Sequence, residues 1–279
     1  MASTFAWAKG HGTENDYIVL PDYDGGVHGD LSKELVTTLC HRRRGLGADG
    51  VLRVVRSSSI HGVPETDAEW FMDYRNPDGS VAQMCGNGAR VFVRFLAESG
   101  LVDPTGPIRF GTRSGTKTAT IAEDGSICVD MGTVELQGSV EIAVGDRSWK
   151  AHKISVGNPH AVVFVDSLEE AGPLQETPEY DVSDFPDGVN VEFVRPEADG
   201  ELSMRVYERG AGETRSCGTG ACAAAVAHVV TEDLVTPTTI RVGVLGGTLE
   251  VPVDTGNEVK LSGPAVIVAQ GELELRLAG

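Results

Sequence analysis

The chain has 279 residues, 41% of them hydrophobic, and a formal net charge of −18 at pH 7. It can bury a core as one large domain or as two of about 130 residues. The negative charge argues against a nucleic-acid partner, because phosphate binding needs clustered Lys and Arg. No segment approaches the ~20 consecutive apolar residues of a membrane helix, so no membrane partner is expected.

Five cysteines, an odd number without zinc-type pair spacing, argue against a disulfide framework and against a metal site. The first residues lack the basic region and the long apolar core of a signal peptide. Free thiols fit a reducing compartment, and we therefore expect a cytoplasmic protein in which a reactive cysteine serves chemistry.

Short apolar runs rich in β-branched residues and bounded by Gly, Asp and Pro predict strands. They cover residues 17–20, 51–55, 70–74, 118–121, 127–130, 161–165, 191–194, 202–207, 239–244, 248–253, 258–261 and 265–269. Helices are predicted over residues 31–42, 86–99 and 218–232. The basic run at residues 41–44 is interpreted as the C-terminal end of the first helix, where cations suit the helix dipole. The third helix is nearly all small and apolar over residues 221–227, which predicts that it is buried.

The second and third helices each follow one copy of a motif, MCGNGA at residues 84–89 and SCGTGA at residues 216–221. The repeat extends further at the same offset, because residues 71–85 align with 203–217 and residues 108–111 align with 240–243. The chain is therefore predicted to be an internal duplication. We expect an α/β (α+β) fold of two pseudo-symmetric lobes, each a curled, mostly antiparallel sheet around a central helix.

The duplication also predicts the domain boundaries. Residues 1–130 are expected to form an N-terminal lobe with Cys85, and residues 131–265 a C-terminal lobe with Cys217. Because residues 134–136 lie at the repeat offset from 266–268, the last strand is expected to cross back, so that residues 266–279 complete the N-terminal lobe. The active site is expected in the cleft between the lobes.

The motif itself suggests a chemistry. A cysteine at the start of a helix is expected to have a thiol pKa lowered towards neutrality, and the free N–H groups of that helix can hold a carboxylate. Two such helix ends around one amino-acid carboxylate would place its α-carbon between two sulfur atoms. One thiolate could then remove the α-proton while the other thiol protonates the opposite face. No P-loop or full dinucleotide motif is present, and we expect no cofactor.

Polar residues near the cysteines allow two interpretations each. Asn76 and Glu208 lie nine residues before Cys85 and Cys217, at the ends of matching predicted strands, which favours a shared pocket over ordinary turns. Arg209 could clamp a second carboxylate, or form a surface ion pair. The other three cysteines lack this context and are expected to be structural: Cys40, Cys128 and Cys222.

The sequence resembles the diaminopimelate epimerase family along nearly its whole length. The similar segments are residues 11–17, 44–49, 76–80, 84–90, 157–160, 188–190, 208–214 and 216–220. The combination of Cys-Gly-Asn-Gly with Cys-Gly-Thr-Gly is highly specific. The resemblance implies a cofactor-independent epimerase that interconverts LL- and meso-2,6-diaminopimelate in lysine and peptidoglycan-precursor biosynthesis. It also implies a two-lobed fold that closes on substrate, and a homodimer.

The resemblance implies roles for individual residues. Cys85 and Cys217 correspond to the acid/base thiols, while His160 and Glu208 contact substrate or adjust the thiol pKa values. A histidine at position 160 could equally be a capping or core residue. The reacting carboxylate is held by Gly86, Asn87, Gly218 and Thr219. The remaining substrate-binding positions are Asn15, Asn76, Asn158, Asn190, Glu208 and Arg209, with Arg209 and the asparagines at the distal amino-acid end.

Two positions depart from the family pattern. Many relatives have Gly in place of Glu14 and Gln in place of Gly50, which puts one polar substrate contact in doubt.

Other functions are weighed against this one. A proline or hydroxyproline racemase of the same fold also uses paired cysteines, but Arg209, Asn76 and Asn190 suit a second zwitterionic end that proline lacks. A phenazine-type isomerase of this fold would lack the cysteine pair. A thiol–disulfide redox protein is disfavoured by the absence of Cys-x-x-Cys. A binding protein without catalysis would have no need of matched thiols.

Overall fold

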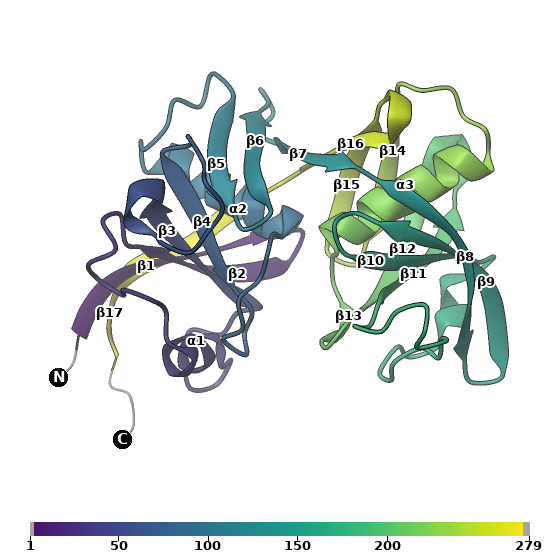
Figure 1. Cartoon of the computed structure of the whole chain (residues 1–279), viewed down its shortest axis with the longest axis horizontal. Coiled ribbons are helices and arrows are strands. Elements are labelled where there is room, and N and C mark those ends of the chain that lie inside the picture. Colours follow the sequence, from purple (N-terminus) through teal and green to yellow (C-terminus); the bar gives the residue numbers. More distant parts are fainter. Residues whose placement is uncertain (1–2, 276–279) are drawn as a thin grey trace. The chain divides into compact units, whose positions relative to one another are not determined.

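The computed structural model describes residues 3–275 (Figure 1). The chain divides into two compact units, which we call the N-terminal unit (Met1–Val129 with Pro264–Gly279) and the C-terminal unit (Asp130–Gly263). Within the described part the chain is mixed α+β and consists mostly of strands. Its α-helices there are α1 (Lys33–Cys40), α2 (Gly86–Glu98) and α3 (Gly218–Thr231). The three predicted helices are therefore confirmed, the first being shorter than expected.

The strands of the N-terminal unit form one consecutive series of pairs. Neighbours are antiparallel, except that β2–β3 and β4–β5 are parallel. In order of pairing the strands are β17 (Val266–Leu275), β1 (Ser3–Gly12), β2 (Asn15–Pro21), β3 (Gly50–Arg56), β4 (Trp70–Arg75), β5 (Ile108–Thr112), β6 (Gly115–Ile121) and β7 (Ile127–Thr133).

The strands of the C-terminal unit follow the same pattern. Neighbours are again antiparallel, except that β10–β11 and β12–β14 are parallel. In order of pairing the strands are β8 (Glu135–Val144), β9 (Arg147–Ser155), β10 (Pro159–Phe164), β11 (Asn190–Pro196), β12 (Glu201–Glu208), β14 (Thr238–Val244), β15 (Gly247–Val253) and β16 (Glu258–Gly263). A short strand, β13 (Gly212–Thr214), pairs with β12. The order of antiparallel and parallel pairs is thus identical in the two units.

Each predicted strand has a counterpart among these elements, but the prediction missed β1, β5, β8, β9 and β13. Strand β8 escaped because most of its side chains are exposed, so it lacks the apolar run that marks a buried strand. The prediction for the last strand is confirmed as far as residue 275, because β17 pairs with β1 along Ser3–His11. Residues 276–279 lie outside the described residues.

Helices α2 and α3 form the centre of their units. Helix α2 contacts β1, β2, β3, β4 and β17, and helix α3 contacts β9, β10, β11, β12, β14, β15 and β16. Figure 1 shows α3 running beside β14–β16. All side chains of α3 from Ala221 to Ala227 are fully buried, as the sequence predicted. Small side chains are needed there, since strands approach the helix from several directions.

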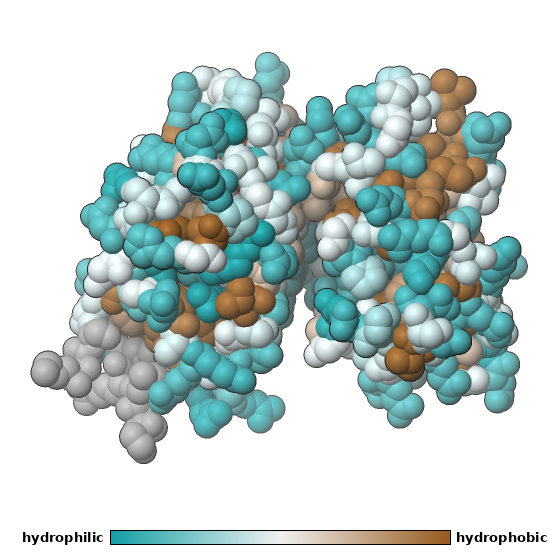
Figure 2. Space-filling view, viewed as in Figure 1, coloured by the Kyte–Doolittle hydropathy of each residue, from teal (hydrophilic) through white to brown (hydrophobic). Residues whose placement is uncertain are grey.

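Hydrophilic residues cover most of the face seen in Figure 2, and hydrophobic residues occur there in separate patches. Between residues 3 and 275, no helix combines the length and the apolar character needed to cross a membrane.

A buried group of charges joins β3 to β4. Arg53 on β3 pairs with Asp22 at 3.3 Å and with Asp73 of β4 at 3.5 Å. Asp73 also accepts from Arg75 at 3.0 Å and pairs with Arg113 at 2.8 Å, and its side chain is fully buried. The carboxylate of Asp73 therefore neutralises guanidinium groups at the strand that leads to Asn76 and then to Cys85.

Replacing Asp73 by Asn removes the carboxylate that pairs with Arg75 and Arg113, and leaves Arg53 with Asp22 alone. Breaking a buried ion pair on one side typically costs about 3–5 kcal/mol, and we expect a loss of that order in the free energy of unfolding. Urea denaturation followed by circular dichroism measures it. The matched control is Asp67→Asn, which breaks the exposed pair with Arg109 and should leave the midpoint unchanged. Equal midpoints for the two variants would contradict the stabilising role of the buried network.

Candidate active site

Cys85 is the N-cap residue of helix α2. Its backbone is extended (φ −143°, ψ 126°), and its carbonyl accepts the hydrogen bond of Ala89 at 2.8 Å that opens the helix. The Cys85 side chain makes no capping bond to the helix and is half-buried. The Sγ atom is therefore directed to other partners than the helix N–H groups.

A chain of short hydrogen bonds surrounds this thiol. The hydroxyl of Tyr17 lies 3.0 Å from Cys85 Sγ and 2.5 Å from Asn15 Oδ1. Asn15 Oδ1 also accepts from Asn87 Nδ2 at 3.1 Å, and Asn15 Nδ2 donates to Asp49 Oδ2 at 2.9 Å. The predicted residues Asn15, Asn87 and Cys85 thus lie in one network, together with Tyr17 and Asp49, which the sequence did not single out.

Arg90 fixes the first turn of α2 from the buried side. Its guanidinium donates to Asn87 Oδ1 at 3.0 Å, to Thr13 Oγ1 at 3.2 Å and to the Gly86 carbonyl at 3.5 Å. The side chain is fully buried. Arg90 therefore holds the Gly-Asn-Gly turn against the loop that carries Asn15.

The two departures from the family pattern have local explanations. Glu14 adopts a left-handed backbone (φ 61°), which glycine occupies at lower cost, so Glu14 is tolerated here with some backbone strain. A Cβ atom at Gly50 would lie 2.8 Å from the Arg75 carbonyl and 2.8 Å from Tyr74 Cε2. A glutamine side chain at position 50 would therefore have no room in this chain.

Asn76 stands directly after β4, as predicted, in a tight turn. Its backbone N–H and its Nδ2 atom both bond Ser80, at 3.0 Å each. The structure gives its amide a local turn contact, and its predicted contact with substrate remains a proposal.

The basic run begins at the C-terminal end of α1, as the sequence predicted, since His41 is the C-cap residue. The last turn of α1 has no basic residue, and Arg42 instead bonds both Asp16 at 2.8 Å and Asp49. Burial would raise the pKa of Asp16, but hydrogen bonds from Arg42 and Lys9 lower it to about 2. Carboxylates beside the helix end thus bind Arg42, and the interaction of the run with the helix dipole stays a prediction. Arg42 thereby braces Asp49, which holds Asn15.

Cys217 is the N-cap residue of helix α3. Its Sγ accepts from the Gly220 N–H at 3.4 Å and lies 3.5 Å from Thr219 Oγ1. The residue is 5% exposed. The backbone start of α3 repeats that of α2, but here the sulfur is buried and bonded to the helix.

A second network extends from Thr219 to the interior. Asn158 Nδ2 donates to Thr219 Oγ1 at 3.3 Å, and Asn158 Oδ1 lies 3.1 Å from His160 Nε2. His160 Nδ1 lies 2.7 Å from Glu192 Oε1, and both side chains are fully buried. These contacts connect Cys217 through Thr219 and Asn158 to a buried histidine–carboxylate pair.

The end of β12 contributes Glu208, and the loop after it contributes Arg209. Thr214 Oγ1 donates to Glu208 Oε1 at 2.5 Å, and the backbone N–H of Arg209 donates to Asn190 Oδ1 at 2.9 Å. The Arg209 guanidinium donates to the Asp187 carbonyl at 2.7 Å. Asn190 is thus in direct contact with the backbone of Arg209.

Burial raises the pKa of Cys217 well above its usual value, and the negative charges of Glu208 and Glu192 raise it further. The hydrogen bonds from Thr219 and Gly220 act in the opposite direction but are weaker. The prediction that the helix end lowers the pKa of this thiol was therefore wrong. It considered the helix N–H groups alone and omitted burial and the two carboxylates.

Sequence reasoning overlooked three buried polar residues of these networks: Tyr17, Arg90 and Glu192. Glu192 and Arg90 carried a usable signal, since a charged residue inside an otherwise apolar strand or helix is rarely buried without a partner. Tyr17 carried none, because an aromatic residue is ordinary in a buried strand. The expected structural role of Cys40 agrees with its burial, which raises its pKa to about 12.

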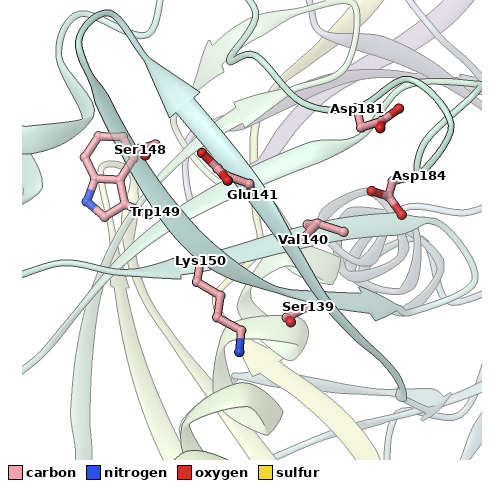
Figure 3. Close-up of a pocket in the computed structure, with 8 residues that line it drawn as sticks. All are labelled: Ser139, Val140, Glu141, Ser148, Trp149, Lys150, Asp181 and Asp184. Carbon is pink, nitrogen blue, oxygen red and sulfur yellow. The ribbon is translucent and has the colours of Figure 1, made fainter.

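Figure 3 shows a pocket of about 680 Å³ elsewhere in the C-terminal unit. It is lined by side chains of β8 and β9, among them Glu141, Trp149 and Lys150, and by Asp181 and Asp184. None of the predicted site residues contributes to it. Among the residues that the structure describes, no cluster of three or more His, Cys, Asp or Glu side chains could hold a metal ion.

Comparison with known proteins gives a consistent result. The sequence model of a family described as diaminopimelate epimerase matches residues 7–137 and 153–271. A protein named diaminopimelate epimerase from Streptomyces coelicolor is 50% identical, over 98% of this chain and 97% of the relative. One of the same name from Thermobifida fusca is 49% identical, over 96% of this chain and 98% of the relative.

Solved structures show the same fold at low identity. A hydroxyproline epimerase from Agrobacterium vitis has a TM-score of 0.74 at 18% identity, covering 99% of this chain and 94% of that protein. A phenazine biosynthesis protein from Bacillus anthracis has a TM-score of 0.70 at 17% identity, covering 98% and 100%. At this low identity the similarity establishes the fold alone. The activity has to be inferred from the relatives of higher identity.

The raised pKa of Cys217 predicts slow alkylation of this thiol in the free protein. Glu208→Gln removes one of the negative charges that disfavour the thiolate, so its pKa should fall. Tenfold more thiolate forms for each unit of that fall, and we expect alkylation of Cys217 by iodoacetamide at pH 8 to accelerate about 3- to 10-fold. Mass spectrometry of the Cys217 peptide measures the rate.

Glu201→Gln, at the opposite end of β12, is the matched control, because Glu201 forms an exposed pair with Arg241. It should leave the rate unchanged, and Cys40 should stay unreactive in both variants. An unaltered rate in Glu208→Gln would show that burial alone controls this thiol.

Proposed function

The chain belongs to the diaminopimelate epimerase family, and we propose that it interconverts LL- and meso-2,6-diaminopimelate by proton transfer between Cys85, Cys217 and the α-carbon. The observation that carries this proposal is the matched pair of cysteines. Each is the N-cap residue of the central helix of its unit, and each is followed by Gly-x-Gly. An epimerase that works without a cofactor needs one base and one acid on opposite faces of the carbon, and the two thiols meet this need.

The proton balance is simple. The thiolate of one cysteine takes the α-proton and becomes a thiol, and the thiol of the other gives its proton to the opposite face and becomes a thiolate. The substrate keeps its proton count, while the two cysteines exchange protonation states. Negative charge develops on the carboxylate as the α-proton leaves. The N–H groups at Gly86, Asn87, Gly218 and Thr219 would stabilise it, each well-placed donor contributing about 3–4 kcal/mol.

The environment of Cys217 indicates which of the two cysteines is protonated before substrate binds. Burial and two nearby carboxylates raise its pKa, which favours the thiol form. We therefore assign the acid role in the resting enzyme to Cys217 and the base role to Cys85. His160 and Glu208 lie in the networks around Cys217 and would adjust its ionisation as substrate charges arrive.

We also propose that the two units are pseudo-symmetric lobes of a duplicated ancestor and that both contribute to one site in a cleft between them. The identical order of strand pairs and the repeated helix starts support the duplication. The need for two thiols at one carbon supports the shared site. A homodimer in a reducing cytoplasm completes the proposal, in keeping with the family resemblance and the free cysteines.

The distal end of the substrate would lie on the C-terminal unit. Arg209 and Asn190 are already in contact, and Asn158 lies within the Cys217 network. A guanidinium matches a carboxylate with two parallel hydrogen bonds. Asn15 and Asn76 would contribute from the N-terminal unit. These groups suit a second amino-acid end, which diaminopimelate has and proline lacks.

The first test concerns the thiols. In Cys85→Ala and in Cys217→Ala, epimerisation should fall by about 10²- to 10⁴-fold, the usual contribution of a positioned acid or base. The assay incubates reduced protein with LL-diaminopimelate in deuterated water and follows both α-deuterium incorporation and formation of the meso isomer. Cys128→Ala, a half-buried cysteine outside both networks, should keep full activity. Inversion at the wild-type rate in either single variant would exclude the two-thiol mechanism.

The second test concerns substrate choice. Arg209→Met removes the distal guanidinium, so the reacting carbon is less well held between the thiols. We expect kcat/KM for diaminopimelate to fall about 100-fold or more. Alkylation of Cys217 should not change, because Arg209 is absent from the groups that shift its pKa.

Arg241→Met, in an exposed ion pair, is the control and should be fully active. Wild-type enzyme should turn over proline, alanine and lysine poorly, because a site built for polar partners rejects analogues that leave them unpaired, often by about 10⁴-fold. Comparable racemisation of proline would transfer the assignment to a proline-type racemase.

A further inference from the structure

Tyr17 occupies an unusual place for a core tyrosine. Its side chain lies on β2 and is 1% exposed, yet its hydroxyl is positioned between two polar atoms, Cys85 Sγ at 3.0 Å and Asn15 Oδ1 at 2.5 Å. A phenol has one hydrogen to donate and can also accept. The geometry therefore allows two arrangements, which differ only in the direction of that hydrogen.

The glycines around Tyr17 allow its ring to lie beside the start of α2. A Cβ atom at Gly88 would come within 3.4 Å of Tyr17 Cζ and 3.3 Å of Leu52 Cδ2. A Cβ atom at Gly50 would lie 3.5 Å from Tyr17 Cδ1. The second glycine of the Cys-Gly-x-Gly motif thus packs directly against the Tyr17 ring.

The repeat shows what stands at the same place in the other unit. Tyr17 is opposite Gly50 in the parallel pair β2–β3, and His160 is opposite Asn190 in the corresponding pair β10–β11. A Cβ atom at Gly88 would meet Tyr17 and Leu52, and one at Gly220 would meet Glu192. In the C-terminal unit this position belongs to the buried His160–Glu192 pair, whereas in the N-terminal unit a neutral hydroxyl reaches the sulfur directly.

When Cys85 is a thiol, its S–H donates to the Tyr17 oxygen and the Tyr17 O–H donates to Asn15 Oδ1. When Cys85 is a thiolate, the Tyr17 O–H turns to the sulfur. Asn15 Oδ1 keeps a donor in both arrangements, because Asn87 Nδ2 lies 3.1 Å away. Each of these four groups keeps a hydrogen bond in both arrangements. In the thiolate arrangement no hydrogen lies between the Tyr17 and Asn15 oxygens, so their 2.5 Å separation must widen by a side-chain adjustment.

We propose that Tyr17 is a further catalytic residue, whose hydroxyl donates to Cys85 when this cysteine is a thiolate and accepts from it when it is a thiol. Tyr17 keeps its own proton throughout, and the proton that Cys85 loses or gains is exchanged with the substrate carbon. This proposal rests on the assignment of Cys85 as an acid/base thiol. It adds a side chain that stabilises the charged form of the base in a half-buried place, where water alone solvates it poorly.

Charged side chains bond the two amides of this network, Asn15 and Asn87. Asp49 bonds Asn15 at 2.9 Å, and Arg90 bonds Asn87 at 3.0 Å. Arg42 pairs with Asp49 and so balances its charge. These groups orient the two amides and leave the Tyr17 hydroxyl as the neutral contact of the sulfur.

The test is Tyr17→Phe, which keeps the ring and removes the hydroxyl. We expect the pH profile of Cys85 alkylation by iodoacetamide to move to higher pH, so that the rate at pH 7.5 falls about 3- to 10-fold, as the loss of one hydrogen bond to the thiolate implies. Mass spectrometry of the Cys85 peptide gives the rate without substrate. The acid side of the kcat/KM profile for diaminopimelate should move in the same direction. A merely structural role would lower activity equally at every pH.

Tyr23→Phe is the matched control, a tyrosine of the same unit whose ring packs on Trp70 at 5.3 Å, and it should leave both profiles in place. If Tyr17→Phe does not fold, 3-fluorotyrosine at position 17 keeps the hydroxyl and makes it a stronger donor, so the alkylation profile should move to lower pH. An unmoved Cys85 profile in the folded variant overturns the proposal for Tyr17. Absence of epimerisation by wild-type protein would instead overturn the proposed function, and the alkylation result would still decide the role of Tyr17.

Discussion

Both central helices begin at a cysteine inside a packed unit, and this constraint determines most of what surrounds them. The first turn of an α-helix has N–H groups without partners in the helix, and burial makes each of them costly unless something accepts its hydrogen. Serine, threonine or aspartate would be the usual cap, because their oxygens accept well. Cysteine is a weaker acceptor, and Cys85 makes no side-chain cap at all. Both helix starts therefore lack a strong oxygen cap, which suits binding of a carboxylate better than it suits stability.

The two ends share their backbone frame but differ in polarity. Around Cys85 the neighbours are a phenol and two amides, held in place by Asp49 and Arg90. Around Cys217 they include carboxylates, and the thiol is 5% exposed. The repeated Gly-x-Gly turn fixes where each sulfur lies, whereas residues on the strands beneath fix how readily it ionises. The two helix starts thus share a backbone frame, while their thiols lie in different surroundings.

The sequence predicted the part of this arrangement that is encoded locally. The motif copies located both helices within one residue of their ends. Strands with exposed side chains, such as β8, were missed because burial is the signal on which strand prediction depends. Tyr17 was missed for the opposite reason, since it occupies an apolar strand where pattern alone indicates core. The direction of the Cys217 pKa was wrong because it depends on Glu192 and Glu208, whose approach to the thiol is a property of the tertiary structure.

Unequal thiols have a consequence for turnover under the proposed mechanism. Each epimerisation leaves the protons of Cys85 and Cys217 exchanged, so the enzyme must restore its resting form before it repeats the reaction in the same direction. A buried thiolate at position 217, beside carboxylates that raise its pKa, regains a proton readily once product has left. A hydroxyl that follows the charge of Cys85 makes the loss of a proton at the other thiol less costly. Both effects favour the same resting state, with Cys217 protonated and Cys85 prepared to act as the base. The difference between the two environments therefore favours the step in which the thiols regain their resting protonation states. Two thiols in identical environments would have no preferred direction for this step.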